Sequence, residues 1–347
     1  MLQWYFQKGE AEMVKMDPIR SELKSRRIKW DKDTSAVNWA WLKEVRENNP
    51  TRRIYEENPY AEVYTFRENM YGIFTENADG HTDVWSYLIL GPEKAMLIDT
   101  SFGIGNFKAL ADRLSGGREV IVANTHASYD HSYGNAWFDK AYCHKYIAPL
   151  MKTNQNPHIW DYLFDENGKN IWLDFDRGDL PPVNEFEVIP CENHHIFDLG
   201  QGYEVELIWM PGHQSGHAFF LDRRNRILFT GDGLETGSSM VGYGAREGDV
   251  YGEQYANVSS MYHEFKALAE RMDEIDYLFP AHGILNVESR VLPAVLKGLE
   301  HIVNDPEHPT RKEEKLNKKG KLNVRCFQQV PGFTELNYNP DAVFPKK

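Results

Sequence analysis

The sequence has little cysteine: only Cys143, Cys191 and Cys326 occur among its 347 residues. Their odd number, and the lack of any C-x-x-C spacing, exclude a disulfide framework and a thiolate zinc site. We therefore expect three free thiols packed in the interior. Because a chain without disulfides is typical of a reducing compartment, the sequence predicts a cytoplasmic protein.

Long apolar runs and an excess of positive charge are also missing. No apolar run approaches the ~18 residues that a membrane-spanning helix needs, and residues 1–8 lack the apolar region of a signal peptide. Lys and Arg number 39 against 52 Asp and Glu, a formal net charge of −13. Because phosphate backbones are bound by clustered cations, this balance disfavours a nucleic-acid partner. We expect a small-molecule substrate and neither nucleic-acid nor membrane binding.

The sequence does contain enough apolar material for a sizeable core, since 41% of its residues are hydrophobic. Asp17 and Pro18 predict a helix that runs to about residue 29, and Ser35 predicts the cap of a second helix with Trp39 and Trp41 on its apolar side. We therefore predict a helical N-terminal extension over residues 1–60. Its aromatic side either packs on the parent domain or forms a homo-oligomer contact.

The rest of the chain is predicted to form one domain over residues 61–304 and a tail over 305–347 that packs on it. An irregular, aromatic-rich insertion at about 151–182 interrupts this domain. Long loops of this kind are often lids or binding loops, although a structural cap over apolar surface is the alternative. Trp160 and Trp172 of the insertion are therefore candidate substrate-binding residues.

Four segments share one pattern, in which an apolar, strand-like run stops at a turn that carries His or Asp. The first turn reads T-H-A-S-Y-D-H, and the others read P-G-H, T-G-D and P-A-H-G. A lone histidine at a strand end is usually a capping or core residue, but this recurrence indicates a metal site. The polar residues at these turns are His126, Asp130, His131, His213, Asp232 and His282.

The order of these turns resembles that of the metallo-β-lactamase superfamily across about residues 63–300. The resemblance implies an α/β fold, a four-layer αββα sandwich of two mixed β-sheets flanked by helices, with the metal ions at one edge. Carried over by position, one metal site uses Asp130, His131 and His282, with Asp232 as a bridging ligand.

The second metal site departs from the family motif His-x-His-x-Asp-His. It would use His126 and His213, but Ser128 stands where the second histidine of the motif belongs. A neutral hydroxyl is a poor ligand compared with an imidazole. We expect one tightly bound ion and a second that is weak, completed by water or absent. Nitrogen and oxygen ligands suit Zn²⁺, with Mn²⁺ or Fe²⁺ as alternatives.

The resemblance implies a metal-dependent hydrolase that uses a metal-activated water on a small carbonyl-containing substrate, cyclic ones included. Asp130 is a candidate general base, or Asp232 if it is not fully engaged as a ligand. His126 and His213, if free of metal, are candidate proton shuttles or oxyanion partners that titrate near neutral pH. Tyr129 and Tyr133 flank the first turn and are candidate substrate contacts.

Two alternatives to this function stay open at the level of sequence. One is a ring-opening C–C hydrolase, or cyclohydrolase, that acts on a cyclic 1,3-diketone. The other is a non-catalytic sensor or scaffold that retains the fold. Asp99 and His217 are predicted to support the site structurally rather than to act on the substrate.

Overall fold

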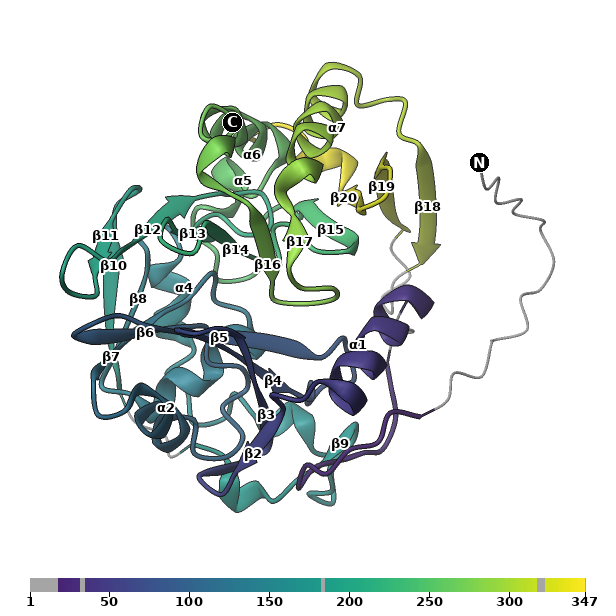
Figure 1. The fold of residues 1–347 in the computed structure, drawn as a ribbon. Coiled ribbons are helices and arrows are strands. Elements are labelled where there is room, and N and C mark those ends of the chain that lie inside the picture. Colours follow the sequence, from purple (N-terminus) through teal and green to yellow (C-terminus); the bar gives the residue numbers. More distant parts are fainter. Residues whose placement is uncertain (1–17, 32–34, 182–184, 317–321, 347) are drawn as a thin grey trace.

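The computed structural model describes residues 18–31, 35–181, 185–316 and 322–346 (Figure 1). Within these residues, two large β-sheets of eight and six strands face one another, and helices cover their outer faces. This arrangement buries the apolar face of every layer against the next one. The predicted four-layer αββα sandwich is therefore confirmed.

The first sheet is mixed, with the strand order β10-β8-β7-β6-β5-β4-β3-β2. β3 to β6 are antiparallel neighbours, whereas β6 and β7, and β8 and β10, are parallel. Its strands are β2 (Arg53–Tyr55), β3 (Asn58–Arg67), β4 (Met70–Thr75), β5 (Val84–Leu90), β6 (Lys94–Ile98), β7 (Glu119–Ala123), β8 (Lys140–His144) and β10 (Glu187–Cys191).

The second sheet has the order β11-β12-β13-β14-β16-β17. β14 and β16 run parallel, so their carboxyl ends reach the same edge of the sheet. Its strands are β11 (Ile196–Asp198), β12 (Glu204–Trp209), β13 (Ala218–Asp222), β14 (Ile227–Gly231), β16 (Tyr277–Pro280) and β17 (Val287–Glu288).

Helices pack on the outer face of each sheet. α2 (Phe107–Ser115) and α4 (Ala148–Thr153) share a core with the first sheet. α6 (Val258–Ala269) and α7 (Leu292–Asn304) share one with the second sheet. A third core fills the space between the sheets, where aromatic rings such as Tyr87, Phe229 and Phe279 are in contact. Two single-turn helices, α3 (Tyr129–Ser132) and α5 (Gly252–Tyr255), lie in loops.

The N-terminal region differs from its prediction. No helix forms in residues 18–29; this stretch contains the short strand β1 (Arg26–Arg27), which pairs with β9 (Leu173–Asp174) of the insertion. The second predicted helix is confirmed as α1 (Ala36–Asn48), and the Ser35 side chain accepts a hydrogen bond from the Asn38 amide. The apolar side of α1 packs on the core of its own chain. The predicted homo-oligomer contact stays a prediction.

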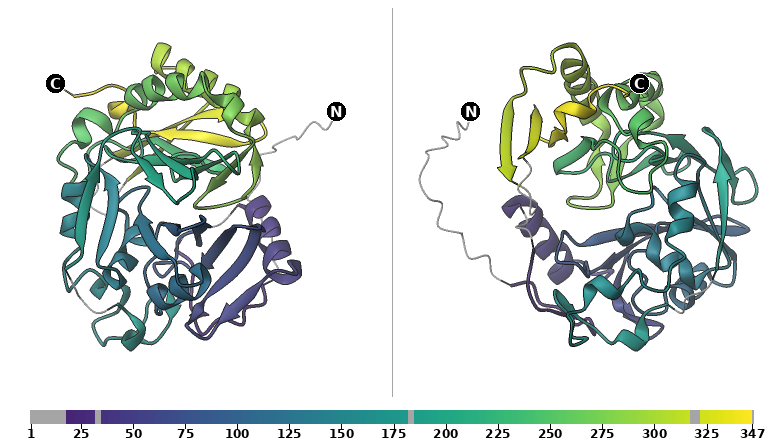
Figure 2. Two further views of the ribbon diagram at one scale, coloured as in Figure 1. Left: turned by 60° about the vertical axis from the view of Figure 1, so that its left-hand side comes forward. Right: turned by 180° about the vertical axis from the view of Figure 1, so that it is seen from behind.

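The C-terminal residues add a third sheet beside the sandwich (Figure 2). It contains β15 (Gly237–Gly242), β18 (Arg311–Leu316), β19 (Leu322–Val330) and β20 (Thr334–Tyr338). β20 runs parallel to β15, so the end of the chain holds the glycine-rich segment that follows β14. Part of this glycine-rich segment is therefore a strand.

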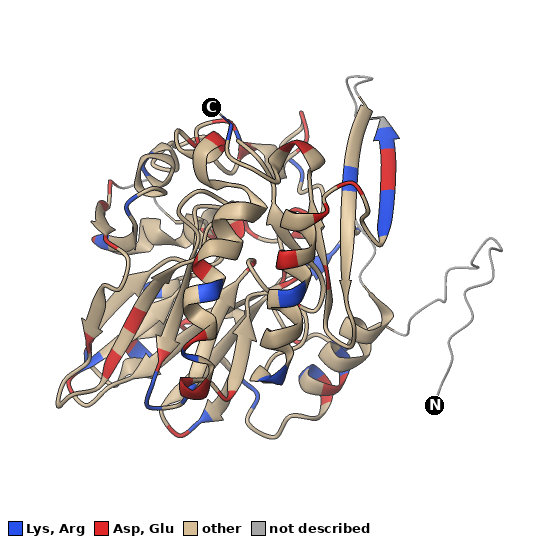
Figure 3. Ribbon diagram, turned by 90° about the horizontal axis from the view of Figure 1, so that it is seen from above, with Lys and Arg blue, Asp and Glu red and all other residues tan. Residues whose placement is uncertain are grey.

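Acidic and basic positions are interspersed along the ribbon (Figure 3). In the part of the chain that the structure describes, no helix has the length and apolarity to cross a membrane. The three cysteines are buried and free, as the sequence predicted. The cytoplasmic location stays a prediction.

Candidate metal centre

Polar side chains from the loops after β7, β12, β14 and β16 meet at one edge of the sandwich, and the loop after β12 contributes His213. The loop after β7 brings His126 and continues into α3, which carries Asp130 and His131. Asp232 directly follows β14, and His282 lies two residues after the end of β16. At Gly231, a side chain would place its Cβ 2.8 Å from Cβ of Thr125, and the backbone φ is +50°. Glycine is therefore required at the position that directs Asp232 inward.

The first predicted ligand set is assembled. Nε2 of His131 and Nε2 of His282 lie 3.1 Å and 3.3 Å from Oδ1 of Asp232. Asp130 places Oδ1 3.5 Å from Nε2 of His131 and Oδ2 3.4 Å from Nε2 of His282. Four side chains from three loops thus direct their ligand atoms at a common centre.

Several of these atoms are buried without a hydrogen bond. Nε2 of His126 has no hydrogen-bond partner among the described residues, and Nε2 of His131 and Oδ1 of Asp232, although 3.1 Å apart, form no hydrogen bond of good geometry with any described group. A buried polar atom normally has a partner, because leaving it unpaired costs about 1–3 kcal/mol. Imidazole nitrogens and a carboxylate oxygen are a donor set that binds a divalent metal ion. These residues therefore fit a metal ion.

Hydrogen bonds to Asp99 and to the Asp83 carbonyl group orient the two histidines His131 and His282. Asp99 accepts hydrogen bonds from the Thr125 amide and hydroxyl, both at 2.8 Å, and contacts Nδ1 of His131 at 2.9 Å. Nδ1 of His282 contacts the Asp83 carbonyl oxygen at 2.9 Å. Such contacts fix the tautomer of a histidine and leave Nε2 free to bind a metal. The geometry agrees with a supporting role for Asp99.

The charges of the site raise the pKa of two histidines. Burial lowers the pKa of His131 and of His282, but the neighbouring carboxylates outweigh this effect and raise both values well above the ordinary range. Asp232 makes the largest opposing contribution to each, and Asp130 adds to it. Without a metal ion, these imidazoles therefore hold protons that a metal would displace.

The second predicted ligand set is incomplete. His126 and His213 each place Nε2 3.6 Å from Oδ2 of Asp232, whereas Ser128 contributes no imidazole. Burial is the largest cause that lowers the pKa of both histidines well below the ordinary value. They are therefore neutral acceptors, which differs from the expectation that they titrate near neutral pH. His217 contacts the His126 ring at a centroid distance of 5.1 Å, but its ring nitrogens have no hydrogen-bond partner in the described chain.

Two residues beside Ser128 were missed by sequence reasoning. Gln214 donates a hydrogen bond from Nε2 to Oγ of Ser128 at 2.9 Å. Arg246 places Nη1 3.5 Å from the same Oγ and Nη2 3.4 Å from Nε2 of His213, with its guanidinium 3.6 Å from the centre of the Tyr243 ring. Gln214 could have been noticed as the neighbour of a predicted ligand. Arg246 lies in a glycine-rich stretch with no distinguishing pattern.

The candidate substrate residues belong to an aromatic cluster beside Asp130. The Tyr129 and Tyr133 rings lie 6.2 Å apart, and burial, with a smaller effect of Asp130, raises the pKa of Tyr133 to about 12. Trp160 is only 4% exposed, and its ring contacts the Tyr133 ring edge to face at a centroid distance of 5.8 Å. Trp172 is half-buried and contacts the cluster through Tyr162 at 6.4 Å. The insertion thus packs against the loop that carries the ligands.

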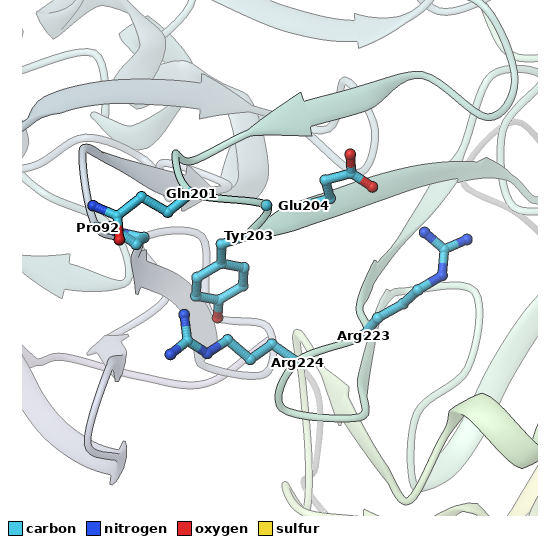
Figure 4. Close-up of a pocket in the computed structure, with 7 residues that line it drawn as sticks. Pro92, Gln201, Tyr203, Glu204, Arg223 and Arg224 are labelled. Atoms are coloured by element: carbon cyan, nitrogen blue, oxygen red, sulfur yellow. The ribbon is translucent and has the colours of Figure 1, made fainter.

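A surface cavity of about 540 Å³ lies elsewhere on the molecule, at the turns that flank β12 and β13 (Figure 4). It is lined by Pro92, Gln201, Gly202, Tyr203, Glu204, Arg223 and Arg224. None of these residues is a candidate ligand. The cavity is therefore separate from the metal centre.

Comparisons with known proteins agree with this geometry. The chain is 23% identical over 236 residues to the acyl-coenzyme A thioesterase MBLAC2 of Gallus gallus, an alignment that covers 63% of this chain and 77% of that protein. The Homo sapiens MBLAC2 is 24% identical over 188 residues, which cover 51% of this chain and 64% of that protein, or less than two thirds of it.

Two solved structures are similar at low identity. The DIM-1 metallo-beta-lactamase is 16% identical with a TM-score of 0.49, covering 70% of this chain and 98% of that one. The metallo-beta-lactamase from Pontibacter korlensis is also 16% identical, with a TM-score of 0.49 and a coverage of 69% and 99%. The family model of the metallo-beta-lactamase superfamily matches residues 79–282, more than half of the chain. The protein therefore belongs to the metallo-β-lactamase superfamily.

Proposed function

We propose that this hydrolase acts on a carbonyl group of a small molecule and that it depends on one divalent metal ion, Zn²⁺ by its donor set. The observation that carries the proposal is the convergence of buried, unpaired ligand atoms from separate loops. A non-catalytic scaffold has no use for such atoms, whose burial without partners is costly. The ion would be held by Asp130, His131, Asp232 and His282.

The bound ion would supply Lewis-acid polarisation of the carbonyl and a lowered pKa for an attacking water. Asp232 and Asp130 differ in the number of histidine nitrogens that they contact. Asp232 lies within 3.6 Å of Nε2 of four histidines. Asp130 faces only two of these nitrogens, at 3.4 Å and 3.5 Å, and accepts a long hydrogen bond from Asn77 at 3.5 Å. Asp130 is thus the better candidate to accept a proton from water.

Acyl thioesters are the first substrate class to test, because the curated relatives are named acyl-coenzyme A thioesterases. A thioester presents a reactive carbonyl and a thiol leaving group. The aromatic cluster around Tyr129 and Tyr133 offers an apolar surface beside Asp130 for the acyl portion.

The test measures thiol release from acyl thioesters of increasing chain length with a thiol-reactive dye. The zinc-loaded protein should release thiol from at least one of them. His282→Ala should lose both the metal and the activity, since it removes a ligand. The matched control His263→Ala alters an exposed histidine on α6 and should retain both.

A cyclic 1,3-diketone serves as the second arm of the same assay, followed by its ultraviolet absorbance. Turnover of the diketone alone would favour the ring-opening alternative over thioester hydrolysis. Retention of full activity by His282→Ala would contradict the assigned metal centre. Less than one ion per chain, together with no turnover of any carbonyl compound, would favour the sensor or scaffold.

A further inference from the structure

We propose that Arg246, Gln214 and Ser128 form an anion-binding position that replaces the second metal ion and holds a carboxylate group of the substrate. The inference rests on the proposed function and deepens it, because it names a chemical feature of the substrate. Ser128 occupies the position of the second histidine in the family motif. Its hydroxyl contacts the Gln214 amide and the Arg246 guanidinium.

Arg246 reaches the site without a carboxylate partner. Its guanidinium lies 3.6 Å from the centre of the Tyr243 ring and is half-buried. Within the described ranges it forms no ion pair, and its Nε has no hydrogen-bond partner. Burial lowers the pKa of Arg246, and Asp232 and Asp249 oppose this only from beyond ion-pair distance, so a ligand that brings a negative charge into direct contact would stabilise the guanidinium.

The same guanidinium disfavours a second metal ion. Nη2 of Arg246 lies 3.4 Å from Nε2 of His213, the atom that would bind that ion. A divalent cation at His213 would therefore lie against a permanent positive charge. Since Ser128 also removes one ligand, only His126, His213 and the shared Asp232 remain for a second metal ion.

The hydrogen bonds around Ser128 set the direction of its donor. Oε1 of Gln214 accepts from the Ala127 amide at 3.1 Å, which fixes the Gln214 side chain so that Nε2 donates to Oγ of Ser128 at 2.9 Å. Because Oγ accepts this bond, the hydroxyl hydrogen of Ser128 remains available to donate. The described residues provide no acceptor for this hydroxyl hydrogen. The Ser128 hydroxyl and the Arg246 guanidinium therefore lie side by side as donors, and an anion between them would accept from both.

A planar carboxylate matches this arrangement. The guanidinium presents N–H groups in a fixed fork that pairs with two carboxylate oxygens, and the Ser128 hydroxyl adds a further donor. The position adjoins His213 and therefore the ligand cluster. The substrate is accordingly a carbonyl compound with a carboxylate close to the carbonyl that reacts.

The first test compares two thiols as probes of the zinc-loaded protein by isothermal titration calorimetry. Mercaptoacetate carries a carboxylate, and 2-mercaptoethanol carries a neutral hydroxymethyl group in the same place. The wild-type protein should prefer mercaptoacetate, and Arg246→Met should reduce this preference about 10- to 100-fold, as expected for a charge-assisted pair. Arg224→Met, which alters another arginine stacked on a tyrosine, at 5.0 Å, should leave it unchanged.

The second test measures the number of zinc ions per chain after the protein is equilibrated with excess zinc and desalted. It remains informative if the Arg246→Met variant does not fold. Wild-type protein and Ser128→His should each retain one ion, whereas the double variant Ser128→His with Arg246→Ala should retain two. Two tightly held ions in the wild type, or an equal preference for the two thiols in wild type and Arg246→Met, would overturn the inference. Neither readout measures turnover: loss of the thiol preference would refute the anion-binding position alone, whereas hydrolysis of carbonyl compounds by the same protein would still support the proposed reaction.

Discussion

Replacement of Asp99 by Asn should weaken metal binding without disturbing the fold. The backbone φ of Asp99 is +61°, a conformation that Asn adopts readily, so the main chain is conserved. The two side chains have nearly the same shape. The change removes the charge and one acceptor atom behind His131.

The magnitude follows from the hydrogen bonds that Asp99 accepts. Oδ1 accepts from the Thr125 amide at 2.8 Å, and Oδ2 contacts the Thr125 hydroxyl at 2.8 Å and Nδ1 of His131 at 2.9 Å. An asparagine must turn its NH₂ group toward one side or the other. Either orientation places donor against donor. Loss of a residue that supports a metal ligand costs about 10- to 100-fold in metal affinity, or about 1.4–2.8 kcal/mol.

The assay is competition for Zn²⁺ against a chromophoric chelator at fixed pH. Asp222→Asn is the matched control, because Asp222 is also buried and accepts hydrogen bonds from Tyr203 and Asn225, both at 2.7 Å. It lies at the end of β13 away from His217. Both variants should lose thermal stability, but only Asp99→Asn should lose zinc affinity. Equal affinity of Asp99→Asn and the wild type would refute the supporting role of Asp99.

Three further predictions follow from the same contacts. His282→Ala should retain less than about a tenth of the bound zinc in elemental analysis; full retention would contradict its role as a ligand. Because carboxylates raise the pKa of His131 and His282 against the effect of burial, the protonated histidines stabilise the metal-free fold at low pH, and this contribution is lost as pH rises through the raised pKa. The rise in melting temperature on zinc binding should therefore be larger at about pH 8 than at about pH 6, and a smaller rise would contradict the assignment. Arg46→Met removes two of the three 2.9 Å contacts that arginines make with the fully buried Glu62 and leaves the one from Arg52, and it should lower the free energy of unfolding in urea by about 2 kcal/mol, as expected for lost hydrogen bonds to a charged group; a change under about 0.5 kcal/mol would show that Arg52 and the other remaining partners satisfy Glu62.

The sandwich could be predicted from the sequence because its signals are local. β14 reads as an apolar run that ends in Thr230 and Gly231, and β16 as one that ends in Pro280, so each strand end indicates the residue that follows it. Parallel pairing of these two strands then brings Asp232 and His282 to one edge. The sequence pattern therefore identifies the candidate ligands, and the strand pairing brings them together at one edge of the sheet.

Other features could not be predicted, because they depend on contacts between distant segments. The Asp17-Pro18 signal favoured a helix, but the stretch that follows is held as β1 by pairing with β9 of the insertion, and Arg27 forms an ion pair with Asp83 at 2.9 Å. Tertiary contacts here override the local preference. The position of Arg246 likewise depends on β15 pairing with β20, which begins about ninety residues later in the chain.

The metal content of active protein tests the central claim most directly. Protein purified without added metal should be chelated and assayed for thioester hydrolysis, then reloaded with one equivalent of zinc and assayed again, with elemental analysis at each stage. The geometry predicts about one ion per chain, loss of activity on chelation and recovery on reloading. Hydrolysis at an undiminished rate by protein shown to hold no metal ion would contradict it.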